Sequence, residues 1–292
     1  MRSKKYIRLL HHSIIILIAM SGLSFQWPLE ESIVTSTFGE SRWDHYHDGM
    51  DIVSMKNQVC SMGDGNIAYF WDKSIFPLDK YPGGGNYMVL EHRTDLYSVY
   101  MHLDDGLKIR KHFKAGDIIG TSGNTGHSFA RHLHFSLLNI VKKSSYNPLM
   151  YLSKIDDEKK PQIMELMIRI GDRYTVIREN GDIRLTKHYP LLVNIRDSIK
   201  GRENVGIYKL SVSHNDRSVL NVKFAEISYS KKGLTILNKT YDDLYDVKGY
   251  YKINDIRYID GLNKVTVTAS DYNGNEFIKE FQFNVKLDME LN

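Results

Sequence analysis

The sequence contains a single cysteine, Cys60, among its 292 residues. One thiol forms neither an internal disulfide nor a cysteine-based zinc site, so packed cores have to stabilise the fold. Repeats and low-complexity tracts are also absent, and the chain is 42% hydrophobic and 25% charged. This composition excludes a disordered chain, a collagen-like repeat and a multi-span membrane protein, and the length accommodates about two domains.

Acidic residues are absent from the sequence before Glu30, and basic residues are in no excess after it. Four of the 39 basic residues precede Glu30, and the remaining 35 equal the 35 acidic residues. Because a neutral chain lacks the positive charge that neutralises phosphates, we expect no nucleic-acid partner.

The basic start leads into an apolar run, Ser13–Met20, that is too short for a typical membrane span. The small residues Gly22 and Ser24 follow it, which completes the layout of a secretory signal. We therefore predict a signal peptide over residues 1–24 and an exported protein of the periplasm or cell envelope. An uncleaved membrane anchor stays open, since residues 9–27 come close to the roughly 20 that a spanning helix needs.

Short apolar runs separated by glycine turns predict mostly antiparallel strands from residue 33 to about 152. The charged residues 153–161 contain too few apolar side chains to pack, so we predict a linker there. Residues 162–292 again alternate like strands, and residues 258–275 resemble the last hairpin of an Ig-like sandwich. The expected fold is mainly β, with one domain over 25–152 and a smaller Ig-like β-sandwich over 162–292.

Histidine is scarce in the last half of the chain, and eight of the ten histidines after the leader lie before residue 135. Among these, His47 and Asp51 are four residues apart, a spacing that puts both on one side of a strand or a helical turn. His132 and His134 are two apart, so a strand directs both imidazoles to one face. His45 shares the parity of His47 and is an alternative partner of the same cluster.

A third strand is expected over residues 97–102, where Ser98, Tyr100 and His102 would share a face. Two imidazoles and one carboxylate leave a tetrahedral Zn²⁺ an open position for water, as in catalytic zinc sites. Such an ion lowers the pKa of the water toward roughly 7 and polarises a bound carbonyl. Each histidine taken alone is equally compatible with a hydrogen-bonded structural role, but the ordered set predicts a zinc enzyme.

Several motifs between residues 33 and 152 follow one another in a recognisable order. They are Phe38-Gly39-Glu40, His47-Asp48-Gly49-Met50-Asp51, Gly63-Asp64-Gly65, Gly85–His92, Tyr100-Met101-His102-Leu103, Ala115–Gly120, Gly123-Asn124-Thr125-Gly126 and His132-Leu133-His134-Phe135. This stretch resembles the M23 (lysostaphin/LytM-type) zinc metallopeptidases. The resemblance implies an antiparallel β-sheet groove and an exported metalloendopeptidase that hydrolyses peptide bonds of peptidoglycan, in cross-bridges or stem peptides, through a zinc-activated water.

The resemblance also implies a role for each residue of the cluster. His47, Asp51 and His134 become the zinc ligands, and the family register favours His47 over His45. His102 and His132 become the catalytic pair that activates the water and stabilises the oxyanion. Because all candidate ligands precede the linker, we expect residues 25–158 to bind zinc as the whole chain does.

Two residues depart from the pattern of the family beside the His132–Phe135 motif. Arg131 stands where small residues and proline are usual, and Ser136 stands where glutamate is usual. We therefore expect an atypical groove wall and an altered choice of substrate. The alternative function is a catalytically silent LytM-type module that binds the wall or regulates another hydrolase, although all five site positions are retained. For residues 162–292 we expect a binding or spacing role, with an envelope partner as its target.

Overall fold

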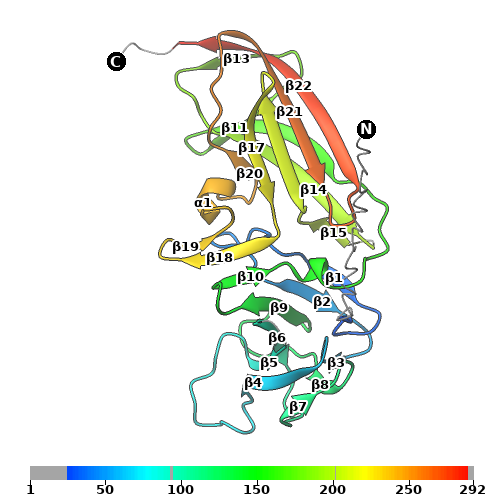
Figure 1. Ribbon diagram of the computed structural model, residues 1–292. Helices are drawn as coiled ribbons and strands as arrows, with labels where there is room; N and C mark the ends of the chain where they lie inside the picture. The colour runs from blue at the N-terminus through cyan, green and yellow to red at the C-terminus, as the bar shows by residue number, and fades with distance from the viewer. Residues whose placement is uncertain (1–24, 93–94, 201, 289–292) are drawn as a thin grey trace, which may run out of the picture.

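The computed structural model describes residues 25–92, 95–200 and 202–288, so the predicted signal peptide lies outside the described residues. They form 22 strands, one four-residue α-helix and one 3₁₀ turn, arranged in two lobes (Figure 1). None of the helical segments described has the length and apolar character needed to cross a bilayer. The expectation of a mainly β protein with antiparallel sheets is confirmed. We call residues 25–152 the first half and residues 162–288 the second half.

The first half is built on one antiparallel sheet whose strands follow the order β10-β9-β6-β5-β4-β7. Strand β2 pairs with β9, and β1 pairs with β2. A separate pair, β3 and β8, packs beside the sheet. The elements are β1 (Ile33–Ser36), β2 (Met50–Val53), β3 (Gln58–Cys60), β4 (Gly65–Trp71), β5 (Asn86–Glu91), β6 (Leu96–Leu103), β7 (His112–Phe113), β8 (Ile118–Thr121), β9 (Leu133–Asn139), β10 (Ser144–Tyr146) and the 3₁₀ turn Pro148–Met150.

Alternation along β9 explains how this sheet carries a core on one face and polar groups on the other. Leu133, Phe135 and Leu137 are fully buried, whereas His134 between them is partly exposed. Burying three such side chains contributes on the order of 1.5–3 kcal/mol each. The strand is thereby fixed in the one register that presents His134 on the face opposite the core.

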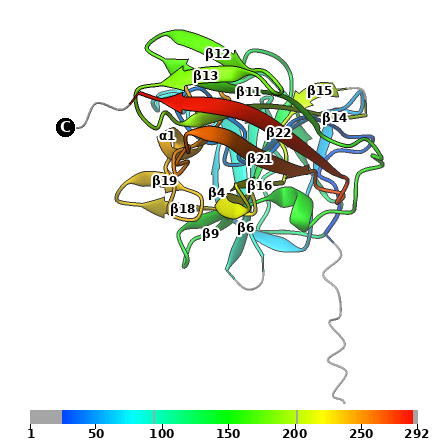
Figure 2. The same cartoon turned by 90° about the horizontal axis from the view of Figure 1, so that it is seen from above.

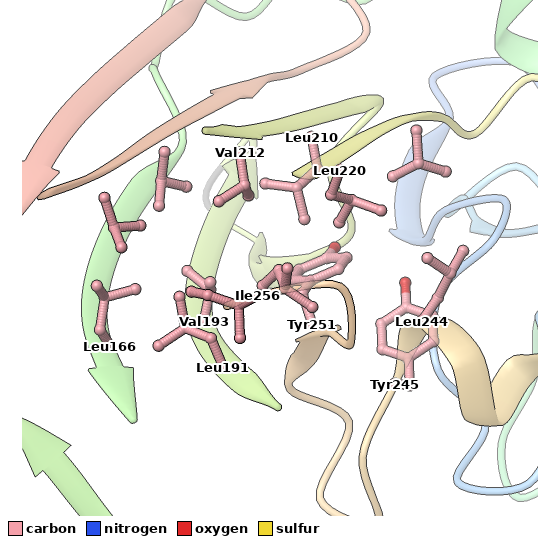
Figure 3. Close-up of a cluster of buried hydrophobic side chains, with 14 of the residues drawn as sticks. Leu166, Leu191, Val193, Leu210, Val212, Leu220, Leu244, Tyr245, Tyr251 and Ile256 are labelled. Atoms are coloured by element: carbon pink, nitrogen blue, oxygen red, sulfur yellow. The ribbon is translucent and has the colours of Figure 1, made fainter. Parts of the chain in front are cut away.

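The second half consists of two sheets that pack face to face over a shared apolar core (Figure 3). One sheet holds β11 (Gln162–Ile170), β12 (Arg173–Ile177), β14 (Leu191–Ile199), β15 (Arg202–Val205) and β20 (Tyr251–Ile253). The other holds β13 (Asp182–Leu185), β16 (Lys209–His214), β17 (Arg217–Lys223), β21 (Gly261–Ser270) and β22 (Glu276–Leu287). Figure 2 shows β21 and β22 running side by side, consistent with their long antiparallel ladder. These sheets form a β-sandwich, and its Ig-like character stays a prediction.

Residues 153–161 contain no helix or strand, but the two halves are joined by much more than this segment. The hairpin of β18 (Glu226–Ser230) and β19 (Gly233–Thr235) comes from the second half, yet β18 pairs with β10 and extends the sheet of the first half (Figure 1). The helix α1 (Tyr241–Leu244) follows it. In return, Phe38 and Tyr46 of the first half are fully buried in the core of the sandwich. The boundaries at 152 and 162 stay predictions.

Candidate metal centre

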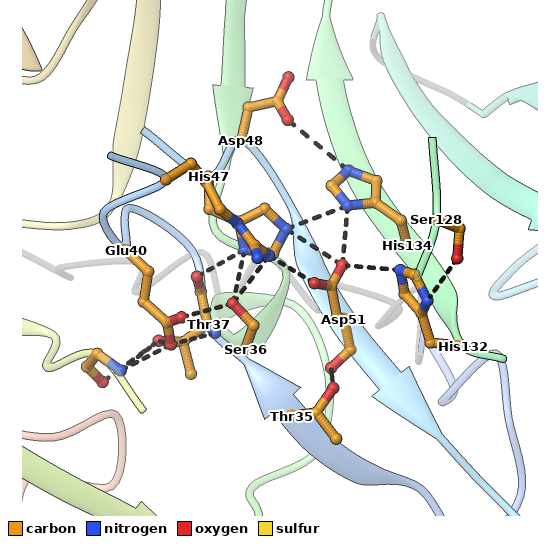
Figure 4. A network of polar contacts seen from close by, with 12 residues as sticks. Thr35, Ser36, Thr37, Glu40, His47, Asp48, Asp51, Ser128, His132 and His134 are labelled. Atoms are coloured by element: carbon orange, nitrogen blue, oxygen red, sulfur yellow. Dashed lines mark hydrogen bonds and ion pairs between the residues drawn. The ribbon is translucent and has the colours of Figure 1, made fainter. Parts of the chain in front are cut away.

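The candidate metal centre lies where β2 pairs with β9. In this antiparallel ladder Asp51 lies directly opposite His134, and His47 precedes β2 by three residues. The Nε2 atom of His47 lies 3.1 Å from Nδ1 of His134 and 3.2 Å from Oδ1 of Asp51. The third side of this triangle, from His134 Nδ1 to Asp51 Oδ1, measures 2.9 Å (Figure 4).

These three atoms fit a tetrahedral zinc ion. Ligand atoms of such an ion stand about 3.3 Å apart when the bonds are about 2.0 Å long. The observed separations are close to that value, and imidazole nitrogens with a carboxylate are suitable donors. Of the residues the structure describes, only His47, Asp51 and His134 form a cluster of this kind.

His47 is held by its second ring nitrogen. Its side chain is buried, and Nδ1 lies 2.9 Å from the carbonyl oxygen of Thr37. Because a carbonyl only accepts hydrogen bonds, Nδ1 carries the proton and donates, which leaves the Nε2 lone pair for a metal. Ser36 Oγ lies 3.2 Å from the same nitrogen.

His134 is oriented in the same way by Ser136, two residues further along β9. Its Nε2 lies 2.9 Å from Ser136 Oγ, and its Nδ1 faces Asp51. An imidazole that offers Nδ1 to a metal carries its proton on Nε2, where Ser136 Oγ is positioned to accept it. Ser136 is itself buried. The hydroxyl that replaces the usual glutamate of the family therefore supports a ligand, a role that the sequence-based interpretation of a changed groove wall missed.

Asp51 is surrounded by positive and hydrogen-bonding groups. Burial opposes its charge, but in the protein without metal a protonated His47, through its charge and a hydrogen bond, and a hydrogen bond from His134 hold the pKa of Asp51 well below its usual range. A bound metal would take the place of these protons. Arg42 adds an ion pair with Oδ2, so both carboxylate oxygens are engaged. Asp51 is therefore an anion at neutral pH, as a metal ligand has to be.

His132 and His102 stand beside the three ligands without joining them. The Nε2 of His132 is 3.7 Å from Asp51 Oδ1, while its Nδ1 is 2.8 Å from the carbonyl oxygen of Ala130. The ring of His102 lies 4.8 Å from that of His132, and its Nδ1 donates to the carbonyl oxygen of Thr125 at 2.8 Å. Burial first, and then the neighbouring imidazoles, lower the pKa of His102 to about 4.

The route by which His102 reaches the site differs from the sequence-based expectation. A regular strand would place it with Tyr100, yet Tyr100 is fully buried against Phe135 in the core. A register shift between β5 and β6 and a φ of +62° at His102 turn the imidazole toward His132 instead. Such bulges redirect side chains beside active sites.

The remaining candidates lie elsewhere. His45 is exposed and paired with the Asp44 carboxylate, so it does not enter the cluster. Arg131 bonds Asp104 and the carbonyl oxygen of Ser122, away from the ligands. Sequence analysis assigned no role at the site to five further residues, although two of them stand in its motifs, because hydrogen bonds from backbone carbonyls and polar side chains leave no pattern in a sequence. They are Ser36, Thr37, Glu40, Arg42 and Thr125.

Part of the chain is similar in sequence to known proteins. Residues 45–148 match the sequence profile of peptidase family M23, and a second profile, which carries no functional description, matches residues 160–286. The murein hydrolase activator NlpD of Escherichia coli (strain K12) is 34% identical over 131 residues, which make up 44% of this chain and 31% of NlpD. The peptidoglycan DD-endopeptidase ShyB of Vibrio cholerae is 35% identical over 94 residues, 32% of this chain and 20% of ShyB. The chain thus covers about a third or less of either relative.

A solved structure of a zinc containing peptidase from Vibrio cholerae is 29% identical, with a TM-score of 0.33, over 39% of this chain and 36% of that one. The family profile covers the five residues His47, Asp51, His102, His132 and His134. Residues 45–148 of this chain therefore form a domain of peptidase family M23.

Proposed function

We propose that this protein is an exported zinc metalloendopeptidase that hydrolyses peptide bonds in peptidoglycan. The observation that carries the proposal is the triangle of His47 Nε2, Asp51 Oδ1 and His134 Nδ1, with separations of 2.9 to 3.2 Å. The M23 domain supports the reaction class, and the similarity to the peptidoglycan DD-endopeptidase ShyB supports the substrate.

Zinc at the triangle would supply a Lewis acid that polarises the scissile carbonyl and increases the acidity of water. The chain supplies the proton transfers. His102 and His132 both donate through Nδ1 to backbone carbonyls, so each keeps an unprotonated Nε2 when neutral. These nitrogens take a proton from the attacking water and, once protonated, donate to the oxyanion or the leaving amine.

The first prediction separates binding from chemistry in single alanine variants. Variants at His47, Asp51 or His134 lose one of three protein ligands, so zinc and turnover on purified sacculi are lost together. Variants at His102 or His132 keep near-stoichiometric zinc while turnover falls by about 10²- to 10⁴-fold. An alanine at the exposed His112, which bonds Asn66 away from the site, is the matched control. Full zinc occupancy in all three ligand variants would refute the ligand assignment.

The second candidate function is a regulator that binds the wall and activates another hydrolase. The printed name of NlpD, a murein hydrolase activator, favours it. The two functions differ in a simple assay, because an endopeptidase releases fragments from sacculi alone, whereas an activator releases them only when a second hydrolase is added. Mass spectrometry of the released fragments also identifies the bond that is cut.

Export and an envelope partner complete the proposal. The leader predicts cleavage near Ser24, and N-terminal sequencing of protein recovered from the envelope fraction tests it. Recovery of the intact chain from the cytosol would contradict a wall substrate. We further propose that the second half takes part in partner binding, which pull-down from envelope extracts with the full chain addresses.

A further inference from the structure

We infer that the second half contributes to zinc binding at the proposed metal centre, because its residues fix the Thr37–Glu40 segment, which in turn orients His47. This inference rests on the proposed zinc site and extends it across the predicted domain boundary, so it replaces the expectation that residues 25–158 alone bind zinc as the whole chain does. The key group is the backbone N–H of Gly206, which directly follows β15 in the second half.

The carboxylate of Glu40 accepts hydrogen bonds from donor groups of both halves. Its Oε1 accepts hydrogen bonds from Thr37 N at 2.6 Å, Thr37 Oγ1 at 2.7 Å and Gly206 N at 2.7 Å. Its Oε2 accepts a further bond from Ser36 Oγ. Bonds to an ionised acceptor are the strong ones, so this carboxylate ties the segment to Gly206.

The carbonyl groups between Thr37 and Glu40 are also held by the second half. Tyr272 donates its hydroxyl to the carbonyl oxygen of Phe38 at 3.1 Å, and Tyr245 donates to that of Gly39 at 2.9 Å. The Phe38 side chain is fully buried in the sandwich core. Three residues in succession, Thr37 to Gly39, are therefore positioned by contacts from beyond the linker.

His47 contacts this segment through its backbone and its ring. The Gly39 N–H donates to the carbonyl oxygen of His47, and the His47 N–H donates to that of Glu40. The carbonyl oxygen of Thr37 accepts the Nδ1–H of His47, and that bond sets which nitrogen faces Asp51 and His134. Partners of this kind, one bond removed from the metal, typically change metal affinity by about 10- to 100-fold when they are lost. Glu40 and Gly206 are thus positioning residues for the ligand, although neither touches the metal position.

Point variants of the full chain test the inference. A Cβ added at Gly206 would lie 2.6 Å from Glu40 Cγ and 2.8 Å from Thr37 Oγ1, so Gly206→Ala displaces Glu40 without a substitution in the first half. Glu40→Ala removes the acceptor itself. Glu40→Gln is the rescue variant, since its amide oxygen accepts the Thr37 and Gly206 bonds and its NH₂ donates to Ser36. We expect zinc affinity to fall about 10- to 100-fold in the two disruptive variants and to recover in Glu40→Gln.

Two matched controls lie within the second half. Glu179→Ala removes a carboxylate that accepts a backbone bond from Gln282, and Gly181→Ala adds a Cβ near Arg178. Zinc affinity is measured by competition with a chelating dye, the ligand geometry by the visible spectrum of the cobalt-substituted protein, and the fold by circular dichroism. Both controls should keep the affinity and the cobalt spectrum of the wild type.

The outcomes separate this inference from the proposed function. Folded Gly206→Ala protein that binds zinc as tightly as the wild type overturns the inference while the wild-type enzyme still hydrolyses sacculi. If Glu40→Ala does not fold, the comparison of Gly206→Ala with Glu40→Gln decides the matter. Wild-type protein that binds zinc but cuts nothing refutes the endopeptidase and leaves the inference standing, whereas wild-type protein that binds no zinc refutes both.

Discussion

Single hydrogen bonds decide which nitrogen each imidazole offers to the metal. His47 has its Nδ1 beside the carbonyl oxygen of Thr37, and His134 has its Nε2 beside Ser136 Oγ, so the other nitrogen of each ring faces Asp51. Gly49 permits this approach, because a Cβ there would lie 2.4 Å from Ser136 Oγ and 2.7 Å from His134 Nε2. The ligands are thereby arranged for a metal by their own neighbours.

Ser136→Ala provides the test at this scale. The change leaves the Nε2–H of His134 without its acceptor, so the ring loses its orientation and zinc affinity should fall by about 10-fold or more. Ser144→Ala is the matched control, since Ser144 is buried in the next strand and its hydroxyl has no partner among the described residues. Chelator competition on both variants measures the difference. Equal affinity in the two would show that Ser136 does not support the ligand.

Among the secondary-structure elements, β6 combines regular pairing with one local irregularity. Residues 96–101 pair with β9 in register and bury the side chain of Tyr100. The hydroxyl oxygen of Tyr100 accepts a hydrogen bond from the N–H of Met62, on the core side of the sheet. At His102 the backbone enters the left-handed region, which asparagine tolerates and β-branched residues do not. Position 102 therefore has two requirements: a residue that tolerates a positive φ, and an imidazole side chain for the proposed chemistry.

Substitution of His102 should separate these two requirements. His102→Asn keeps the backbone conformation, so the thermal midpoint and zinc content should stay near the wild-type values while turnover falls by about 10²- to 10⁴-fold. His102→Val should lower the midpoint as well, because valine is strained at this φ. Thermal unfolding and turnover on sacculi give both numbers. Equal midpoints for the two variants would show that the positive φ imposes no cost on the fold.

At the scale of the whole molecule, the second half contains a buried acid beside the linker. Asp197 is 3% exposed, and its Oδ2 has no hydrogen-bond partner among the described residues. Burial raises the pKa of Asp197 to about 7, and the negative charges of Asp271 and Asp157 add to this effect. The hydrogen bond from the Ser198 N–H acts in the opposite direction. Asp197 is therefore largely protonated in the folded protein at mildly acidic pH.

This buried acid predicts a pH dependence of stability. In the unfolded chain an aspartate has a pKa of about 3.9, so between about pH 4 and pH 7 the folded state binds the extra proton. The stability that Asp197 confers is thus present at low pH and is lost as the pH rises through about 7. Asp197→Asn should remove this loss, and the difference in thermal midpoint between variant and wild type should grow from pH 5 to pH 8. Parallel midpoint curves would contradict the protonated acid.

Local patterns in the sequence determined the mainly β fold and the placement of His132 and His134 on one face, whereas the resemblance to family M23 selected the five candidate residues of the cluster. These features depend on period-2 alternation, on glycine turns and on short spacings, which a sequence displays directly. The same patterns indicated a β-sandwich beyond residue 161, and its two facing sheets bear this out. The reason given for His102 was wrong, since a bulge and not alternation brings it to the site.

Only the tertiary structure decided what surrounds those five residues. The hairpin β18–β19 extends the first sheet, Phe38 and Tyr46 pack into the sandwich, and Gly206 reaches Glu40 across 166 positions of the chain. Such contacts join backbone groups and apolar side chains that are far apart in sequence, and neither leaves a periodic or spaced signal. The sequence by itself thus indicated the candidate donors of the metal centre, whereas only long-range packing determined the orientation of each donor.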